Sequence, residues 1–157
     1  MKEPVYNILD IRRGTTVDGP GLRTSIYIAG CRHGCPGCHN PDSWNPGAGT
    51  PMTLSSLMDI IREEDFDVTL TGGDPLWLGM KLLPLVEAIK GEGKNIWLYT
   101  GFTINEIRLS PIKRRIAGLV DTIVEGRFIE ALRDTDLRFR GSSNQRIIAI
   151  SGRPTAE

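Results

Sequence analysis

The chain has 157 residues, a length that fits one domain over 1–157 and excludes a complete eight-fold β/α barrel, which needs about 250 residues. Its 19 lysine and arginine residues balance its 19 aspartate and glutamate residues, so no net charge favours nucleic acid as a partner. The sequence shows no run of 18 apolar residues that could span a membrane and no signal peptide, so we expect a cytoplasmic protein.

Five apolar stretches are typical of β-strands, and each is followed within a residue or two by a glycine. They are Leu22–Ala29, Phe66–Thr71, Asn95–Thr100, Asp121–Glu125 and Gln145–Ile150. The repeated order of strand and glycine predicts five similar exits from strand to loop.

Helical patterns lie between these strands. They are the segment that begins after Thr53, Met80–Lys90 with Pro84 in its first turn, the segment after Thr103, and Ile112–Ala117. Thr103 and Glu106 have the spacing of a capping box. The alternation predicts an α/β fold with a mostly parallel sheet of about five to six strands, either a small open partial barrel or a curved sheet.

All three cysteines lie within eight residues, as Cys31, Cys35 and Cys38, directly after the first predicted strand. Ligands of parallel α/β folds gather at the carboxyl ends of the strands. Three thiolates on one loop can hold three corners of a cubane iron–sulfur cluster, which normally takes four cysteines. One iron would then have no cysteine from this chain, and it could bind a substrate or a cofactor directly.

Other interpretations of the three cysteines stay open at this point. A zinc ion could bind them with His33 or His39 as the fourth ligand, which would make the chain a non-enzymatic binding module. A histidine could also complete an electron-transfer cluster, or the three cysteines could be structural and unliganded.

Motifs along the chain resemble a known family. The CxxxCxxC spacing after a first strand is the signature of radical S-adenosylmethionine (SAM) enzymes, and Thr71–Pro75 (TGGDP) is similar to their GGE motif. Asp18–Thr24 (DGPGLRT) resembles the opening of glycyl-radical enzyme activases. Three further segments resemble the activases of anaerobic ribonucleotide reductases, namely Gly30–Trp44, Trp97–Gly101 and Arg140–Arg146. Two departures from the superfamily are Asp74 in place of glutamate and Gly37 in place of an aromatic residue.

The resemblance implies an open partial barrel of the radical SAM type, in which Cys31, Cys35 and Cys38 ligate a [4Fe–4S] cluster and SAM chelates the fourth iron. Reductive cleavage of SAM would give a 5′-deoxyadenosyl radical. That radical would abstract an α-hydrogen from a glycine of the reductase's large catalytic subunit. A reduced flavodoxin-like protein would supply the electron. The residues expected to contact the cofactors are Gly37, Cys38, His39, Gly72, Gly73, Asp74 and Thr100.

Each of these assignments has a structural alternative. Gly72 and Gly73 would let the backbone approach the methionine moiety, since a Cβ would collide there, but TGGDP could equally be an exit turn in which Asp74 caps the next segment. Thr100 could be an ordinary buried strand end, and Arg140–Arg146 is either a contact segment or a solvated loop. Activation of another glycyl-radical enzyme, of the formate-lyase type, is the alternative function.

Overall fold

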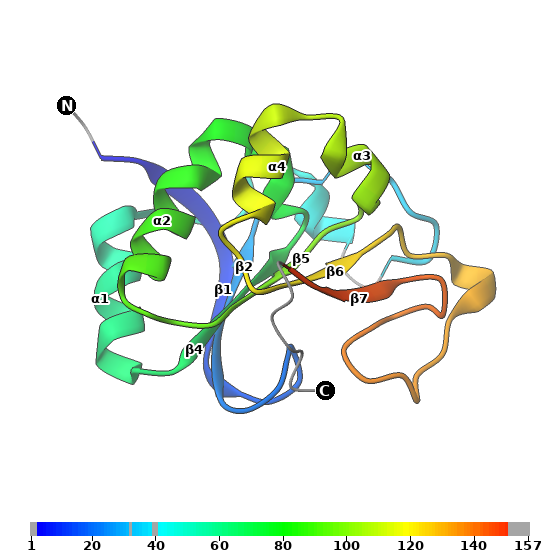
Figure 1. The fold of residues 1–157 in the computed structure, drawn as a ribbon, viewed down its shortest axis with the longest axis horizontal. Coiled ribbons are helices and arrows are strands. Elements are labelled where there is room, and N and C mark those ends of the chain that lie inside the picture. Colours follow the sequence, from blue (N-terminus) through cyan, green and yellow to red (C-terminus); the bar gives the residue numbers. More distant parts are fainter. Residues whose placement is uncertain (1–2, 32, 39–40, 151–157) are drawn as a thin grey trace.

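A computed structural model describes residues 3–31, 33–38 and 41–150 (Figure 1). It contains one sheet with the order β3-β1-β2-β4-β5-β6-β7. The strands are β1 (Val5–Thr15), β2 (Arg23–Ile28), β3 (Thr50–Thr53), β4 (Asp67–Gly72), β5 (Ile96–Tyr99), β6 (Thr122–Glu125) and β7 (Arg146–Ala149). The helices are α1 (Leu54–Glu64), α2 (Leu83–Gly91), α3 (Ile104–Arg108) and α4 (Pro111–Ala117), with 3₁₀ helices η1 (Pro41–Trp44), η2 (Pro75–Leu82) and η3 (Glu130–Leu132).

The centre of the sheet is parallel. Strands β2, β4, β5 and β6 run in the same direction, whereas β1, β3 and β7 pair antiparallel with their neighbours. The sheet stays open, so the predicted α/β class with an open, mostly parallel central sheet is confirmed. All five predicted strands are present within one or two residues of their expected bounds.

The expectation of five similar strand exits is wrong for the last strand. Because β7 runs antiparallel to β6, its end lies at the opposite edge of the sheet from the ends of the four parallel strands. The segment 126–145 holds only the short helix η3, and it returns the chain at the same edge instead of crossing over (Figure 1). Gly152, the glycine expected after this strand, lies outside the described residues.

The prediction of five to six strands misses β1 and β3. In β1 only Tyr6 and Ile8 are buried, and the second half of the strand carries Arg12 and Arg13 on partly exposed backbone. This pattern lacks the sustained alternation by which a strand is found in a sequence. Strand β3 contains Pro51, which is tolerated because β3 is an edge strand.

The helices are predicted by residues that lie close together in the sequence, and the structure confirms these predictions. Thr53 caps α1 by accepting a hydrogen bond from Ser56 N, and Thr103 with Glu106 forms a complete capping box. Pro84 lies in the first turn of α2, as predicted. That helix begins at Leu83 instead of Met80, because residues 80–82 belong to η2, which is kinked at Gly79, where φ is positive at 58°.

The two faces of the sheet differ in character. Alternate residues of β2, β4 and β5, such as Ile26, Leu70 and Leu98, pack with the helices in an aliphatic core. Helices α1 and α2 lie side by side against the sheet in Figure 1. The intervening residues, among them Thr69 and Trp97, point to the other face, which is polar and aromatic.

Arg23 joins this second face to the DGPG segment. Its guanidinium is buried and donates to Thr69 Oγ1, the carbonyls of Pro20, Val68 and Asn95, and Asn95 Oδ1. A Cβ on Gly19 would lie 2.8 Å from Arg23 Cδ, so the glycine leaves room for this side chain. In the part of the chain that the structure describes, no helix has the length and apolarity needed to cross a membrane.

Candidate functional site

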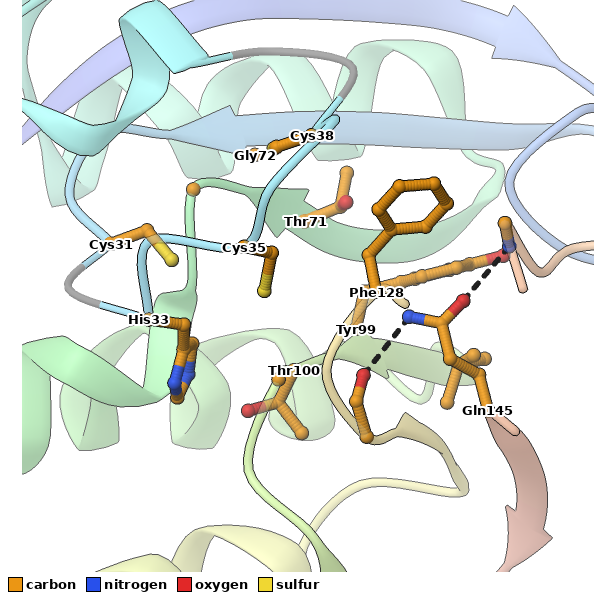
Figure 2. Close-up of a pocket in the computed structure, with 15 residues that line it drawn as sticks. Cys31, His33, Cys35, Cys38, Thr71, Gly72, Tyr99, Thr100, Phe128 and Gln145 are labelled. Carbon is orange, nitrogen blue, oxygen red and sulfur yellow. Dashed lines mark hydrogen bonds between the residues drawn. The ribbon is translucent and has the colours of Figure 1, made fainter. Parts of the chain in front are cut away.

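A cavity of about 230 Å³ lies at the carboxyl edge of the parallel strands (Figure 2). Its walls come from the cysteine loop (Cys31–Cys38), the ends of β4, β5 and β6, and the segment 126–145. The lining residues are Cys31, His33, Cys35, Cys38, Thr71, Gly72, Gly73, Tyr99, Thr100, Gly101, Val124, Gly126, Phe128, Gly141 and Gln145. The structure thus brings the three cysteines together with Gly72, Gly73 and Thr100, as expected.

The other residues expected at the site are Gly37, Asp74 and His39. Gly37 and Asp74 are absent from the lining of the cavity, and His39 lies outside the described residues. Gly37 has a positive φ of 73°, and a Cβ there would lie 2.7 Å from Glu130 Cδ. An aromatic side chain at position 37 would be close to η3, which gives a structural reason for the glycine at this place.

The three cysteines are unpaired thiols, each partly buried. Figure 2 shows Cys31 and Cys35 pointing into the space bounded by His33 and Thr100. Burial raises the pKa of the Cys31 thiol, and the negative charges of Asp74 and the other cysteines act in the same direction. Iron would reverse this effect, because a coordinated thiol is deprotonated by the charge of the metal.

A single metal ion and an iron–sulfur cluster place different demands on the three thiols. A zinc site needs four donors within about 2.0–2.3 Å of one ion. Among the described residues, no three His, Cys, Asp or Glu side chains converge in this way. Three thiolates that each bind a different iron of a cubane do not need a common centre.

His33, one of the two histidines considered as a zinc ligand, is bound elsewhere. Its Nε2 lies 2.7 Å from Asp74 Oδ2, and both side chains are almost completely buried. Asp74 Oδ2 also accepts from Thr100 Oγ1 at 2.9 Å and from Gly101 N at 2.8 Å. Its Oδ1 accepts from Leu76 N and caps η2, so the capping alternative for Asp74 is confirmed.

The two glycines of the TGGDP motif are required by the protein's own backbone. At Gly72, which has a φ of 115°, a Cβ would collide with N and O of Ile28. At Gly73 it would overlap the carbonyl of Gly30 and lie 2.8 Å from Ser43 O. A collision with strand β2 and the loop after it thus requires both glycines even without a ligand, and the expected collision with the methionine moiety stays a prediction.

The wall across the cavity from the cysteines is held by Gln145 (Figure 2). Its Nε2 donates to Gly126 O at 2.9 Å, and its Oε1 accepts from the backbone of Gly141 at 2.9 Å and of Ser142 at 3.1 Å. Part of the segment Arg140–Arg146 is thus a wall of the cavity, which decides against a purely solvated loop. Sequence reasoning missed Phe128, and the glycine that ends the preceding strand is the signal that could have suggested it.

The hydroxyl group of Tyr99 is unusual among the polar groups near the site. Its Oη is buried and has no hydrogen-bond partner among the described residues. Burial strongly raises the pKa of this phenol, so the hydroxyl stays protonated. Leaving a buried hydroxyl group unpaired is costly, and the charged groups near this one are Asp18 and Arg23.

Comparison with known proteins decides the family. Residues 17–148 match the family model described as a 4Fe-4S single cluster domain. The chain is 37% identical over 139 residues to the anaerobic ribonucleoside-triphosphate reductase-activating protein of Escherichia coli K12, covering 82% of this chain and 89% of that protein. The chain belongs to this family of reductase-activating proteins. The 4Fe-4S match also speaks against the zinc-binding module.

Other members of the family agree with this assignment. The activating protein of Pasteurella multocida is 38% identical over 140 residues, which cover 82% of this chain and 88% of that protein. The protein of the same name from enterobacteria phage T4 is 33% identical over 139 residues, covering 83% of this chain and 86% of its own length. The likeness therefore extends over nearly the whole of each activating protein.

One solved structure is similar to this chain, and the similarity concerns the fold only. The crystal structure of QueE from Escherichia coli superposes with a TM-score of 0.53 at 20% identity. The match covers 63% of this chain and 54% of the QueE chain, so the chain spans about half the length of that protein.

Proposed function

We propose that this chain is a radical SAM enzyme that activates an anaerobic ribonucleoside-triphosphate reductase by installing a glycyl radical on its large catalytic subunit. The observation that carries the proposal is the single cavity that Cys31, Cys35 and Cys38 all line, in a chain of the 4Fe-4S reductase-activating family. When bound, a [4Fe–4S] cluster and SAM supply one-electron cleavage of SAM and a 5′-deoxyadenosyl radical, which takes the glycine α-hydrogen.

The three thiolates would hold three irons of the cluster and leave the fourth for SAM. His33 Nε2 is committed to Asp74, so this nitrogen is not available to the cluster. His39 and Gly37 stay candidates for contact with the cofactors on the family pattern alone. Asp74 would act through the residues that it holds, since four hydrogen bonds within the protein occupy its carboxylate.

The cavity offers SAM a polar side and an apolar side. The backbone of Gly72 and Gly73 reaches it from β4, and Tyr99 and Thr100 line it at the end of β5. Phe128 lines the opposite wall and limits the access of water. These residues orient the cofactor and exclude solvent, which is the part that a protein plays in such chemistry.

The partners follow from this chemistry. The large subunit of the reductase is the proposed protein substrate, and one of its loops would have to reach the cavity. A reduced flavodoxin-like protein in the cytoplasm is the proposed electron donor. We treat residues 1–157 as one domain and propose no role for nucleic acid or a membrane.

Anaerobic reconstitution tests the proposal. The wild-type chain should take up about four irons and four sulfides, and form 5′-deoxyadenosine when it is reduced in the presence of SAM. Replacement of any one cysteine by alanine should abolish this product, while circular dichroism of the metal-free variant stays like that of the metal-free wild type. A reconstituted chain with one zinc and no sulfide would contradict the proposal.

A further inference from the structure

We propose that His33 is a positioning residue that anchors the cysteine loop to the sheet through Asp74 and so sets the orientation of Cys31 and Cys35. The inference rests on the proposed function, because it assumes that these cysteines hold the cluster. It assigns His33 and the Asp74 carboxylate to the support of the cluster instead of to contact with a ligand.

The place of His33 in the chain makes it suited to this role. It lies two residues from Cys31 and two residues from Cys35, at the middle of the segment that separates them. Its side chain is 3% exposed, and its Nε2 lies 2.7 Å from Asp74 Oδ2. Fixing this imidazole therefore restricts the backbone that leads to Cys31 and the backbone that leads to Cys35.

Asp74 is itself held in place by hydrogen bonds to several elements of the fold. Its carboxylate accepts from the end of β5 through Thr100 Oγ1 and Gly101 N, and from Leu76 N at the start of η2. Its backbone N–H donates to Gly30 O at 2.7 Å, directly before Cys31. The hydrogen bond of His33 thus connects the cysteine loop with β4, β5 and η2 at one buried carboxylate.

The surroundings of the ring leave it one orientation. The imidazole centroid lies 4.6 Å from that of Phe102 in an edge-to-face arrangement and 5.4 Å from that of Trp77. On a third side the ring covers Gly101, where a Cβ would lie 2.5 Å from His33 Cδ2. Aromatic packing and the carboxylate together hold the imidazole more firmly than either would alone.

This geometry also keeps Nε2 away from iron. A carboxylate oxygen accepts, so His33 Nε2 donates to Asp74 and has no lone pair for a metal. The loop is anchored by a histidine without that nitrogen becoming a fourth ligand.

Two substitutions at position 33 test the inference. His33→Leu fills the space but removes the donor, whereas His33→Gln keeps an N–H group near the position of Nε2. Lys90→Met serves as the matched control, because it breaks a partly buried ion pair with Asp121 at the other edge of the sheet. Each chain is reconstituted anaerobically, and its iron release to a chelator, the EPR spectrum of its reduced cluster and the unfolding of its metal-free form are measured.

We expect His33→Leu to release iron about tenfold faster than wild type, the effect of losing one charged hydrogen bond, and to show a changed EPR spectrum. His33→Gln should recover most of the wild-type rate, and Lys90→Met should lower stability without a change in either cluster measurement. If His33→Leu matches wild type in iron release and EPR spectrum, or changes them no more than Lys90→Met, the inference is wrong. A wild-type chain that assembles no iron–sulfur cluster would instead overturn the proposed function.

Discussion

Gly73→Ala distinguishes two reasons for the glycines of the TGGDP motif. If they served only the approach of SAM, the metal-free protein would accept an alanine at no cost. In the structure the new Cβ would lie 2.7 Å from Gly30 C and 2.8 Å from Ser43 O, and still closer to Gly30 O. Because these are backbone atoms, the contact can be relieved only by moving β4 away from the loop that follows β2.

The size of the effect follows from what must move. Separation of the two segments weakens the hydrogen bonds from Gly73 N to Ile28 O and from Asp74 N to Gly30 O, at about 1 kcal/mol each. Overpacking adds about 1–3 kcal/mol. The sum, about 3–5 kcal/mol, corresponds to a fall in Tm of about 6–20 °C for a chain of this length.

Thermal and urea unfolding of the reduced, metal-free protein measures this directly. Gly91→Ala is the matched control, because Gly91 ends α2 and a Cβ there would meet nothing within 4 Å. The control should be neutral or more stable by up to about 1 kcal/mol, since alanine restricts the unfolded chain. A metal-free Gly73→Ala protein as stable as the control would refute the steric argument and restore the ligand as the reason for this glycine.

Three further predictions concern the supports around the site. Arg23→Met should lower the free energy of unfolding in urea by about 2–5 kcal/mol, because it leaves buried acceptors on Thr69, Val68 and Asn95 unpaired; an unchanged midpoint would contradict the role given to this arginine. Gln145→Leu should speed hydrogen exchange of the Gly141 and Ser142 amides about tenfold, and the Ile123 amide serves as the internal reference. Hydrogen bonds from Arg127, and next from the backbone of Thr103, lower the pKa of Glu106 from 4.5 to about 2, so the stability that the pair contributes is present above pH 4.5 and is lost as pH falls towards 2. The difference in the free energy of unfolding between wild type and Arg127→Gln should therefore be small, constant above about pH 5.5 and shrinking below pH 4.5. A difference that grows as the pH falls would contradict this prediction.

The elements that the sequence predicted correctly are those set by neighbouring residues. The capping box at Thr103, the N-cap at Thr53 and the apolar strands of the parallel core depend on residues a few positions apart. Strand β1 depends on pairing with β2 and β3, and only Tyr6 and Ile8 of its residues are fully buried, so its own pattern is weak. The direction of β7 depends on how segment 126–145 folds back, which no local pattern reveals.

In the functional site, too, features set by neighbouring residues could be predicted and features set by distant residues could not. The spacing of the cysteines was enough to predict that they lie together, because they belong to one loop after a strand. The role of Asp74 could not be predicted, since its partners His33 and Thr100 are 41 and 26 positions away in the chain. One reason for the two glycines could not be predicted from the sequence, because the backbone that they approach belongs to the preceding strand and the loop after it and not to a neighbour in sequence.

The most direct test of the account is an EPR measurement on the reductase. The reconstituted chain is incubated without oxygen with SAM, a one-electron reductant and the large subunit of the host's anaerobic ribonucleotide reductase. We predict the doublet of a glycyl radical on the subunit, absent when SAM is omitted or when Cys35→Ala replaces the wild-type chain. A chain that holds its cluster and cleaves SAM, yet leaves the subunit without this doublet, would contradict the assignment of the reductase as its substrate.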